Sequence, residues 1–169
     1  MLVKFRNPWR ALSRTWAPTV DSQVVKLKAS GADVFINIAT PKFAAQAIRK
    51  VAEIGWKPLH IVNNVSASVG GVLKPAGFDN AQDLLTTRYF KDPTDPSWSE
   101  DTAMKAWNAF LDKYYPTADR TNGFVMSGYL ISQTLVQVLK QCGDNFTRDN
   151  VMKQAANLDM ELPLLLPGI

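Results

Sequence analysis

Two short polar stretches in this sequence have the side chains and the spacing to bind a small molecule. Ala39-Thr40-Pro41 ends one apolar run, and Asn63-Asn64-Val65-Ser66 ends the next one. Their hydroxyl and amide groups suit hydrogen bonding to a carboxylate or an amide. Thr40 and Ser66 also stand where helices are expected to begin, and a helix N-terminus offers free N–H groups to an anion. A second interpretation stays open, in which these two side chains only cap their helices.

The sequence holds few groups suited to catalysis. His60 is the single histidine and Cys142 the single cysteine, so an internal disulfide and a cysteine-based metal site are excluded. We expect His60 to be a packed or exposed residue and not a ligand or a base. No G-x-S-x-G or G-x-G-x-x-G motif occurs, and Gly70-Gly71 is too short to cradle a phosphate. These features predict a protein that is not an enzyme and needs no metal or other cofactor.

The two polar stretches belong to a strand–helix–strand pattern. Residues 34–39 form a short run rich in β-branched and aromatic residues, which indicates a buried strand, and residues 58–64 resemble a second strand. Between them Thr40 suits a helix N-cap, Pro41 the first helical position and Gly55 the helix end. Such a unit makes a parallel crossover, and apolar residues on both sides of the first strand predict a sheet covered on both faces. The apolar positions at helical spacing are Ala44, Ala47, Ile48, Val51 and Ile54.

The same patterns place the remaining elements. A third strand is expected over residues 84–90, where threonine and tyrosine favour extended structure. The long segment 123–142 is apolar on most of its faces, which is typical of a buried helix. The resulting order predicts an α/β fold in which a parallel sheet is flanked by helices. Further helices are expected over residues 21–30 (capped by Asp21), 66–73 (weak), 101–115 and 147–157, with a loop over 91–99 and an apolar tail over 162–169.

The formal net charge of +4 is concentrated at the N-terminus. Residues 1–20 contain four basic residues and no acidic one, so acidic and basic residues balance over the rest of the chain. This balance argues against a nucleic-acid partner. The head lacks the apolar core of about 7–15 residues that a secretory signal peptide needs. It shares its Arg-rich, acid-poor character with organelle transit peptides, but we expect a segment that does not belong to the fold.

Several blocks of the sequence, in their order along the chain, resemble the periplasmic substrate-binding proteins of branched-chain amino acid ABC transporters, the leucine/isoleucine/valine-binding family. The resemblance extends from about residue 19 to residue 169, and it depends on the order of the blocks and not on one motif. It implies the type I periplasmic-binding fold, in which two α/β lobes close on a small ligand. The blocks are GADVFINIATPKFAAQAIRKVAEIGWKP, IVNNVSAS, GFDNAQDLLTTRYF, AWNAFLDKYYP and GYLISQTLVQVLKQCG.

The resemblance covers only the later part of that two-lobe architecture. It implies a partial α/β lobe over residues 20–90, helices of the other lobe without their sheet over 91–160, and the start of a truncated return segment over 161–169. Residues 1–19 form an atypical basic head outside the fold. An incomplete architecture of this kind leaves apolar surface exposed, so we expect aggregation or partial unfolding on expression.

The resemblance also implies where a ligand binds and which partners are involved. It places ligand contacts at Ala39, Thr40 and Pro41 and at Asn63, Asn64, Val65 and Ser66. Amino-acid binders of the family often carry an aromatic contact in the first loop and an acidic residue for the ligand ammonium in the second, and neither is present here. Because an amide cannot neutralise a buried ammonium, an organic acid or amide is at least as plausible a solute as a branched-chain amino acid. The implied partners are an ABC permease and ATPase, and the implied location is the periplasm.

Two other functions remain open on the sequence. A small α/β enzyme or a regulatory domain like a response regulator would need a cluster of acids and bases or a phosphate loop. A remnant without binding activity is the second possibility, because the implied cleft is incomplete.

Overall fold

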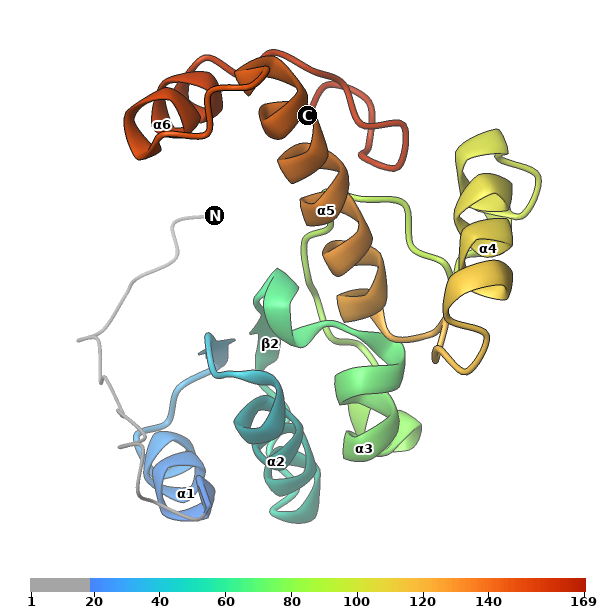
Figure 1. Ribbon diagram of the computed structural model, residues 1–169. Coiled ribbons are helices and arrows are strands. Elements are labelled where there is room, and N and C mark those ends of the chain that lie inside the picture. The colour runs from blue at the N-terminus through green and yellow to red at the C-terminus, as the bar shows by residue number, and fades with distance from the viewer. Residues whose placement is uncertain (1–18) are drawn as a thin grey trace. The chain divides into compact units, whose positions relative to one another are not determined.

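The computed structural model describes residues 19–169, and the chain divides into two compact units between Thr87 and Arg88. Apart from Thr19, the predicted basic head lies outside the described residues. No helix in the described range is long and apolar enough to cross a membrane. The first unit contains α1 (Asp21–Ala29), β1 (Val34–Asn37), α2 (Pro41–Glu53), β2 (Leu59–Val62), η1 (Asn64–Ser66), η2 (Val69–Leu73), α3 (Lys74–Ala76) and η3 (Phe78–Ala81), and the second contains η4 (Pro96–Trp98), α4 (Thr102–Tyr114), α5 (Gly123–Cys142) and α6 (Arg148–Ala156) (Figure 1).

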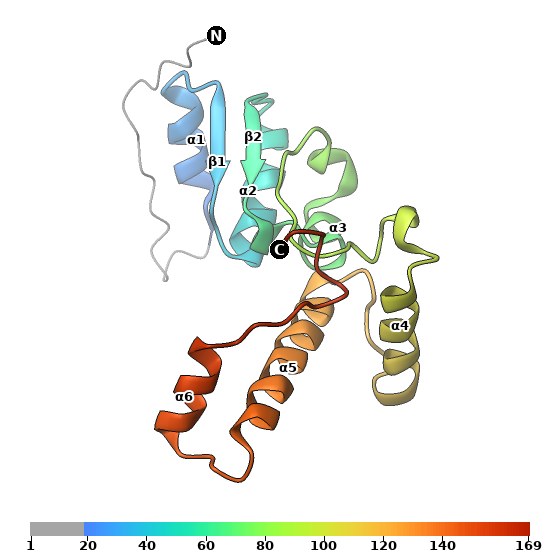
Figure 2. The ribbon, with the colours of Figure 1, turned by 90° about the horizontal axis from the view of Figure 1, so that it is seen from above.

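The first unit is built on the predicted strand–helix–strand pattern. β1 and β2 pair in parallel, with Phe35 opposite His60, and Figure 2 shows the two strands side by side. α2 joins them, with Thr40 at its N-cap position and Pro41 as its first residue, as predicted. The chain leaves this helix through Gly55, whose φ of 62° lies in the left-handed region that favours glycine.

The sheet is covered on one face and bare on the other within the described part of the chain. α1 and α2 pack against the face that carries Phe35. On the opposite face the side chains of Ile36 and Leu59 are 53% and 48% exposed. The expectation of a sheet covered on both faces is therefore wrong for the described residues, because both helices lie on the same side. The sheet residues buried on the covered face are Phe35, Asn37, His60 and Val62.

The core of the first unit follows the apolar face of α2. Four of the five positions predicted from helical spacing are buried, and Ala45 joins them. One part of the core lies between α1, β1 and α2, and the other between α2 and the short helices η2 and α3. The first part contains Val20, Val24, Phe35, Ala47 and Val51, and the second contains Ala44, Ala45, Ile48, Val72 and Ala76.

The predicted third strand over residues 84–90 is not a continuous strand. Leu85 makes a single parallel bridge with Ile61 in the first unit. In the second unit, Phe90 makes an antiparallel bridge with Leu165, and the neighbouring backbone bonds join Tyr89 and Lys91 to the C-terminal tail. The prediction is wrong because the two halves of this run find different backbone partners.

Two predicted helix boundaries also differ from the structure. Val20, and not Asp21, is the N-cap of α1, and Asp21 is the first helical residue. The weak helix expected over residues 66–73 is divided into the 3₁₀-helix η1 and the π-helix η2, followed by the short α3. The paired glycines Gly70-Gly71 lie inside η2, where their low helix propensity is consistent with an irregular helix.

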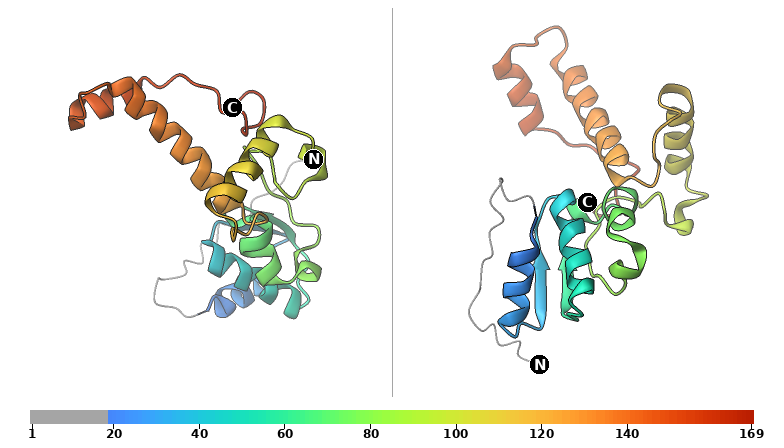
Figure 3. Two further views of the ribbon diagram at one scale, coloured as in Figure 1. Left: turned by 45° about the vertical axis from the view of Figure 1, so that its right-hand side comes forward. Right: turned by 90° about the horizontal axis from the view of Figure 1, so that it is seen from below.

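The second unit has its own core, centred on the fully buried side chain of Trp107. Asp101 is the N-cap of α4, and its side chain accepts a hydrogen bond from the Met104 N–H at 3.0 Å. α5 was expected to be buried, but Ile131 and Leu135 are exposed, because the described residues supply a packing surface along only part of the helix. Figure 3 shows α6 beside the C-terminal part of α5. The buried residues of this core are Phe90, Met104, Trp107, Leu111, Met126, Leu130 and Leu164.

Candidate functional site

The two predicted site segments meet at one edge of the sheet. β1 and β2 are parallel and in register, with Asn37 opposite Val62, so their carboxyl ends lie side by side (Figure 2). The Asn63 N–H donates to the Asn37 carbonyl at 3.1 Å, which extends the pairing into the loop after β2. Ligands of open α/β sheets bind outside the carboxyl ends of the strands. This edge, formed by residues 38–41 and 63–66, is called the strand-end site below.

Thr40 occupies the N-cap of α2 without using its side chain as a cap. The hydroxyl makes no capping hydrogen bond, and the residue is exposed. The first helical bond is donated by the Ala44 N–H to the Thr40 carbonyl at 2.8 Å. The N–H groups of Lys42 and Phe43 precede that bond and point out of the helix end. The Thr40 hydroxyl therefore does not cap α2, which argues against the interpretation in which Thr40 acts only as a helix cap.

Asn63 holds the equivalent position after β2. It is the N-cap of η1, and its side chain makes no capping hydrogen bond. Its Oδ1 atom is buried and has no hydrogen-bond partner among the described residues. A buried acceptor without a donor costs about 1–3 kcal/mol, which favours a movement of the loop that brings Oδ1 to a donor. In the same loop Asn64 is half-buried and Val65 is exposed.

Ser66 has a different environment from the other predicted site residues. Its side chain is fully buried, and its hydroxyl donates to the Ala39 carbonyl at 2.5 Å. It is the last residue of η1, so it does not cap a helix N-terminus either. Ser66 therefore connects the loop after β2 to the loop after β1 from beneath the surface.

The buried polar side chains of the described chain gather behind this site. They are Asn37, His60, Ser66 and Ser68, and all four lie on or directly after β1 and β2. Asn37 Oδ1 accepts from the Ala39 N–H at 3.2 Å, and Asn37 Nδ2 lies 3.4 Å from His60 Nε2. Because the Asn37 oxygen already accepts a bond, its amide nitrogen is the donor and His60 Nε2 the acceptor.

The imidazole of His60 is neutral at physiological pH. Burial lowers the pKa of His60 to about 4, since the charged form loses its hydration. The ring also packs against Phe35 in a tilted arrangement. His60 is a packed residue, as expected. Asn37 was missed, although a single polar residue inside an otherwise apolar run was a signal that could have found it.

The charge around the strand-end site suits a neutral or negative ligand group. Neither loop contains an acidic residue, and Lys42 lies in the first turn of α2. The positive end of the helix dipole adds to this bias. No group of three or more histidine, cysteine or carboxylate side chains is placed to hold a metal ion within the described residues.

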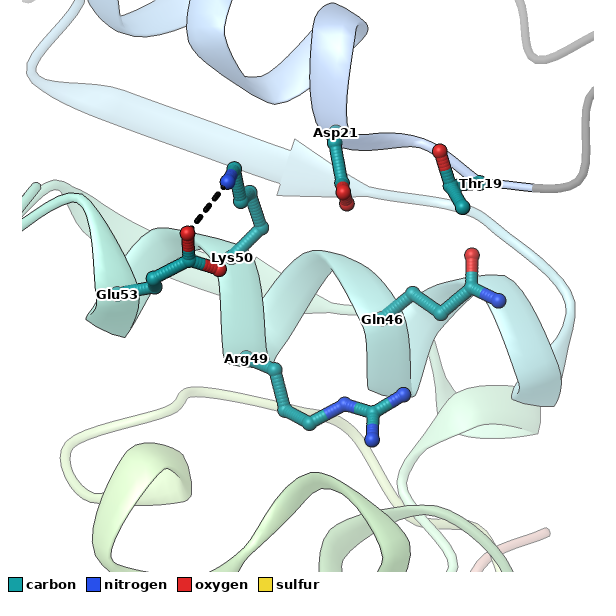
Figure 4. Close-up of a pocket in the computed structure, with 6 residues that line it drawn as sticks. All are labelled: Thr19, Asp21, Gln46, Arg49, Lys50 and Glu53. Carbon is teal, nitrogen blue, oxygen red and sulfur yellow. Dashed lines mark hydrogen bonds and ion pairs between the residues drawn. The ribbon is translucent and has the colours of Figure 1, made fainter.

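A separate hollow lies beside α1 and α2 and is lined by polar and charged side chains. Figure 4 shows Lys50 paired with Glu53 at 2.6 Å within it. The hydrogen bond to Glu53 raises the pKa of Lys50. Its lining contains no residue of the strand-end site and no apolar residue. The lining residues are Thr19, Asp21, Gln46, Arg49, Lys50 and Glu53.

Comparisons with known proteins identify the fold. A sequence model of the periplasmic binding protein family matches residues 17–168. Among solved structures, the chain is similar to a fatty acid ABC transporter substrate-binding protein from Thermomonospora curvata, with 20% sequence identity and a TM-score of 0.65. The likeness covers 87% of this chain and 38% of that chain, so this chain spans well under half the length of that neighbour. No curated protein matches the chain.

These matches confirm the resemblance predicted from the sequence and the predicted α/β architecture, a partial periplasmic-binding fold with a small parallel sheet. The family and the structural neighbour are binding proteins. The chain belongs to the periplasmic binding protein family.

Proposed function

We propose that this chain is part of the solute-binding component of an ABC importer and that its strand-end site binds a small organic acid or amide reversibly. The family match and the similarity to an ABC transporter substrate-binding protein support this role. The proposal includes a periplasmic location, an ABC permease and ATPase as partners, and no enzymatic activity.

One observation carries the proposal. Thr40 and Asn63 are the N-cap residues that follow two adjacent parallel strands, and neither side chain is used for capping. An N-cap threonine or asparagine normally stabilises its helix by about 1 kcal/mol through that bond. Neither side chain makes this bond, and both residues lie at the ligand-binding edge of the sheet. Their polar groups can therefore form hydrogen bonds with a solute.

The chemistry of the site favours a solute with a carboxylate or amide head and an aliphatic part. The Thr40 hydroxyl and the first-turn N–H groups of α2 are donors for a carboxylate or a carbonyl, and Asn63 Oδ1 can accept from an amide N–H once a movement of its loop exposes it. Ile38 and Val65 are exposed in the same two loops and offer apolar contact. The fatty acid named for the structural neighbour is consistent with this class of solute.

A branched-chain amino acid is the second candidate. The buried Oδ1 of Asn63 favours it in one respect, since an ammonium group also donates hydrogen bonds. The absence of acidic residues from both loops disfavours it, because the ammonium charge would stay unneutralised.

The test is a titration of the full ¹⁵N-labelled chain, followed by amide NMR shifts, with hexanoate, hexanamide and L-leucine as probes. We expect hexanoate or hexanamide to shift the amides of Thr40, Lys42, Phe43 and residues 63–65, and leucine to bind more weakly. Thr40→Val should weaken the binding about fivefold, the value of one hydrogen bond. Thr147→Val is the matched control, because Thr147 is the N-cap of α6 and its hydroxyl bonds to Asn145 at 2.8 Å.

Each contrary result identifies a different alternative. Tight binding of leucine alone would assign the site to amino acids. Shifts that map away from both loops would refute the strand-end site. If no probe binds, the chain is a remnant without binding activity.

A further inference from the structure

The backbone around Ala39 is held on both sides by buried side chains. Its N–H donates to Asn37 Oδ1 at 3.2 Å, and its carbonyl accepts from the Ser66 hydroxyl at 2.5 Å. Asn37 is the last residue of β1, and Ser66 is the last residue of η1, beyond β2. The two bonds thus link the loop after β1 to the end of β1 and to the helix η1 that follows β2.

These bonds fix the two peptide groups that flank Ala39. The Ala39 N–H belongs to the peptide group shared with Ile38, and the Ala39 carbonyl belongs to the peptide group shared with Thr40. Each peptide group is planar, so an anchored carbonyl also orients the N–H at its other end. The position of Thr40 and the entry into α2 therefore depend on Asn37 and Ser66.

We propose that Asn37 and Ser66 are positioning residues that hold the Ala39 backbone and thereby set the Thr40 hydroxyl in place for the solute. This inference rests on the proposed function of the strand-end site. It gives Ser66 an indirect role, since a fully buried side chain cannot touch a solute at the surface. It also gives a role to Asn37, which is 3% exposed and whose amide is braced by His60.

Ser68 provides a matched control in the same segment. It is as well buried as Ser66, at 3% exposure, and its hydroxyl accepts from the Gly71 N–H at 3.1 Å. That bond stabilises the start of η2 and does not involve the loop after β1. Both substitutions remove a buried serine hydroxyl, but only Ser66→Ala removes the bond to the Ala39 carbonyl and should change the surroundings of Thr40.

The first measurement needs no solute. Hydrogen exchange of the full ¹⁵N-labelled chain should be about tenfold faster at the Ala39 amide in Ser66→Ala and in Asn37→Ala than in the unsubstituted chain, a change equal to the loss of roughly one hydrogen bond. Ser68→Ala should leave that amide unchanged. Unchanged exchange in Ser66→Ala would overturn the proposal, and because this substitution only removes an oxygen atom, the test does not depend on whether Asn37→Ala folds.

The second measurement is the affinity for hexanoate, by the same NMR titration. Ser66→Ala should weaken binding about fivefold, while Ser68→Ala, with a similar melting temperature, should bind as the unsubstituted chain does. Equal weakening in both variants would reduce Ser66 to a structural residue and refute the positioning role. If the unsubstituted chain binds none of the three probes, the proposed function fails, and the exchange experiment still decides whether the Ala39 backbone is held as proposed.

Discussion

His60 lies directly opposite Phe35 in the parallel register, and their rings pack against each other at an angle of 32° with centroids 4.6 Å apart. This contact places the imidazole against an aromatic face on the covered side of the sheet. Its remaining polar neighbour is the amide of Asn37, which can donate to a neutral ring but not to the charged form. The structure therefore stabilises the neutral state of His60.

The first prediction is that the stability of the first unit falls as the pH decreases from about 6.5 to about 4. The pKa of His60 is lowered to about 4 in the folded chain, from an ordinary value of 6.5. Between these values the unfolded chain binds a proton that the folded chain does not, so unfolding becomes more favourable. A shift of this size corresponds to a loss of about 3 kcal/mol once the pH is below both values.

Urea unfolding at pH 7.5, 6, 5 and 4 measures this loss. His60→Gln keeps a polar side chain without a titrating ring and should remove most of the decrease between pH 6.5 and 4. An equal decrease in this variant would assign the pH dependence to the carboxylates.

The second prediction concerns Asp101 at the start of α4. Its carboxylate accepts from the Met104 N–H and pairs with Lys91 at 2.5 Å, and the bond from Lys91 is the main reason that the pKa of Asp101 is lowered. Asp101→Ala should cost about 1–2 kcal/mol of unfolding free energy at neutral pH. The contribution is present above the ordinary pKa of an aspartate and is lost as the pH falls through the lowered value.

Asp101→Asn distinguishes the loss of the N-cap bond from the loss of the ion pair with Lys91. Asp95→Ala is the control for removing a capping carboxylate at an exposed position. The asparagine retains an N-cap oxygen and should lose less stability than the alanine. Asp95 is exposed and caps only the three-residue helix η4, so its replacement should lower stability less than Asp101→Ala does. A larger loss for Asp95→Ala than for Asp101→Ala would contradict the assigned roles.

The third prediction concerns Trp107 in the core of the second unit. The side chain is fully buried, and its Nε1 has no hydrogen-bond partner among the described residues. Trp107→Ala should cost about 3–5 kcal/mol, because it leaves a large cavity. Trp107→Phe should cost much less, about 1 kcal/mol, since it removes an unsatisfied donor while keeping most of the volume. Equal losses in the two variants, measured by urea unfolding, would show that the indole N–H is satisfied in solution.

The fourth prediction concerns the bare face of the sheet. Ile36 and Leu59 are about half exposed there, on the same face of β1 and β2, where Ile36 lies opposite Ile61 and Leu59 opposite Val34. Ile36→Thr together with Leu59→Thr should reduce self-association in sedimentation experiments and lower the binding of the dye ANS, with little change in stability. Ile48→Thr, which places a hydroxyl in the core at a fully buried position, should instead destabilise the chain. Undiminished association of the double variant would show that another surface is responsible.

The local features of the first unit were predictable from the sequence because neighbouring residues determine them. The N-cap position of Thr40, the first helical position of Pro41 and the left-handed Gly55 depend on short-range geometry, and all three appear as predicted. The meeting of the two polar loops at one sheet edge followed from the parallel pairing of the two strands.

Features that depend on distant partners were not predictable in the same way. The run 84–90 has the composition of one strand, but Leu85 pairs with β2 and Phe90 with the C-terminal tail. The apolar pattern of α5 did not show that much of the helix would stay exposed. The sequence also could not show that the Ser66 hydroxyl would turn inward to Ala39, because that contact joins residues 27 positions apart.

The sheet of the first unit joins only strands that are consecutive in the chain. β1 pairs with β2, and Ile61 of β2 pairs with Leu85. The paired residues are therefore separated by about 25 positions in the sequence. Pairings this local carry a small loop-closure cost and favour rapid folding. The sheet pairings of the first unit can therefore form early within residues 34–85, and the strand-end site forms with them.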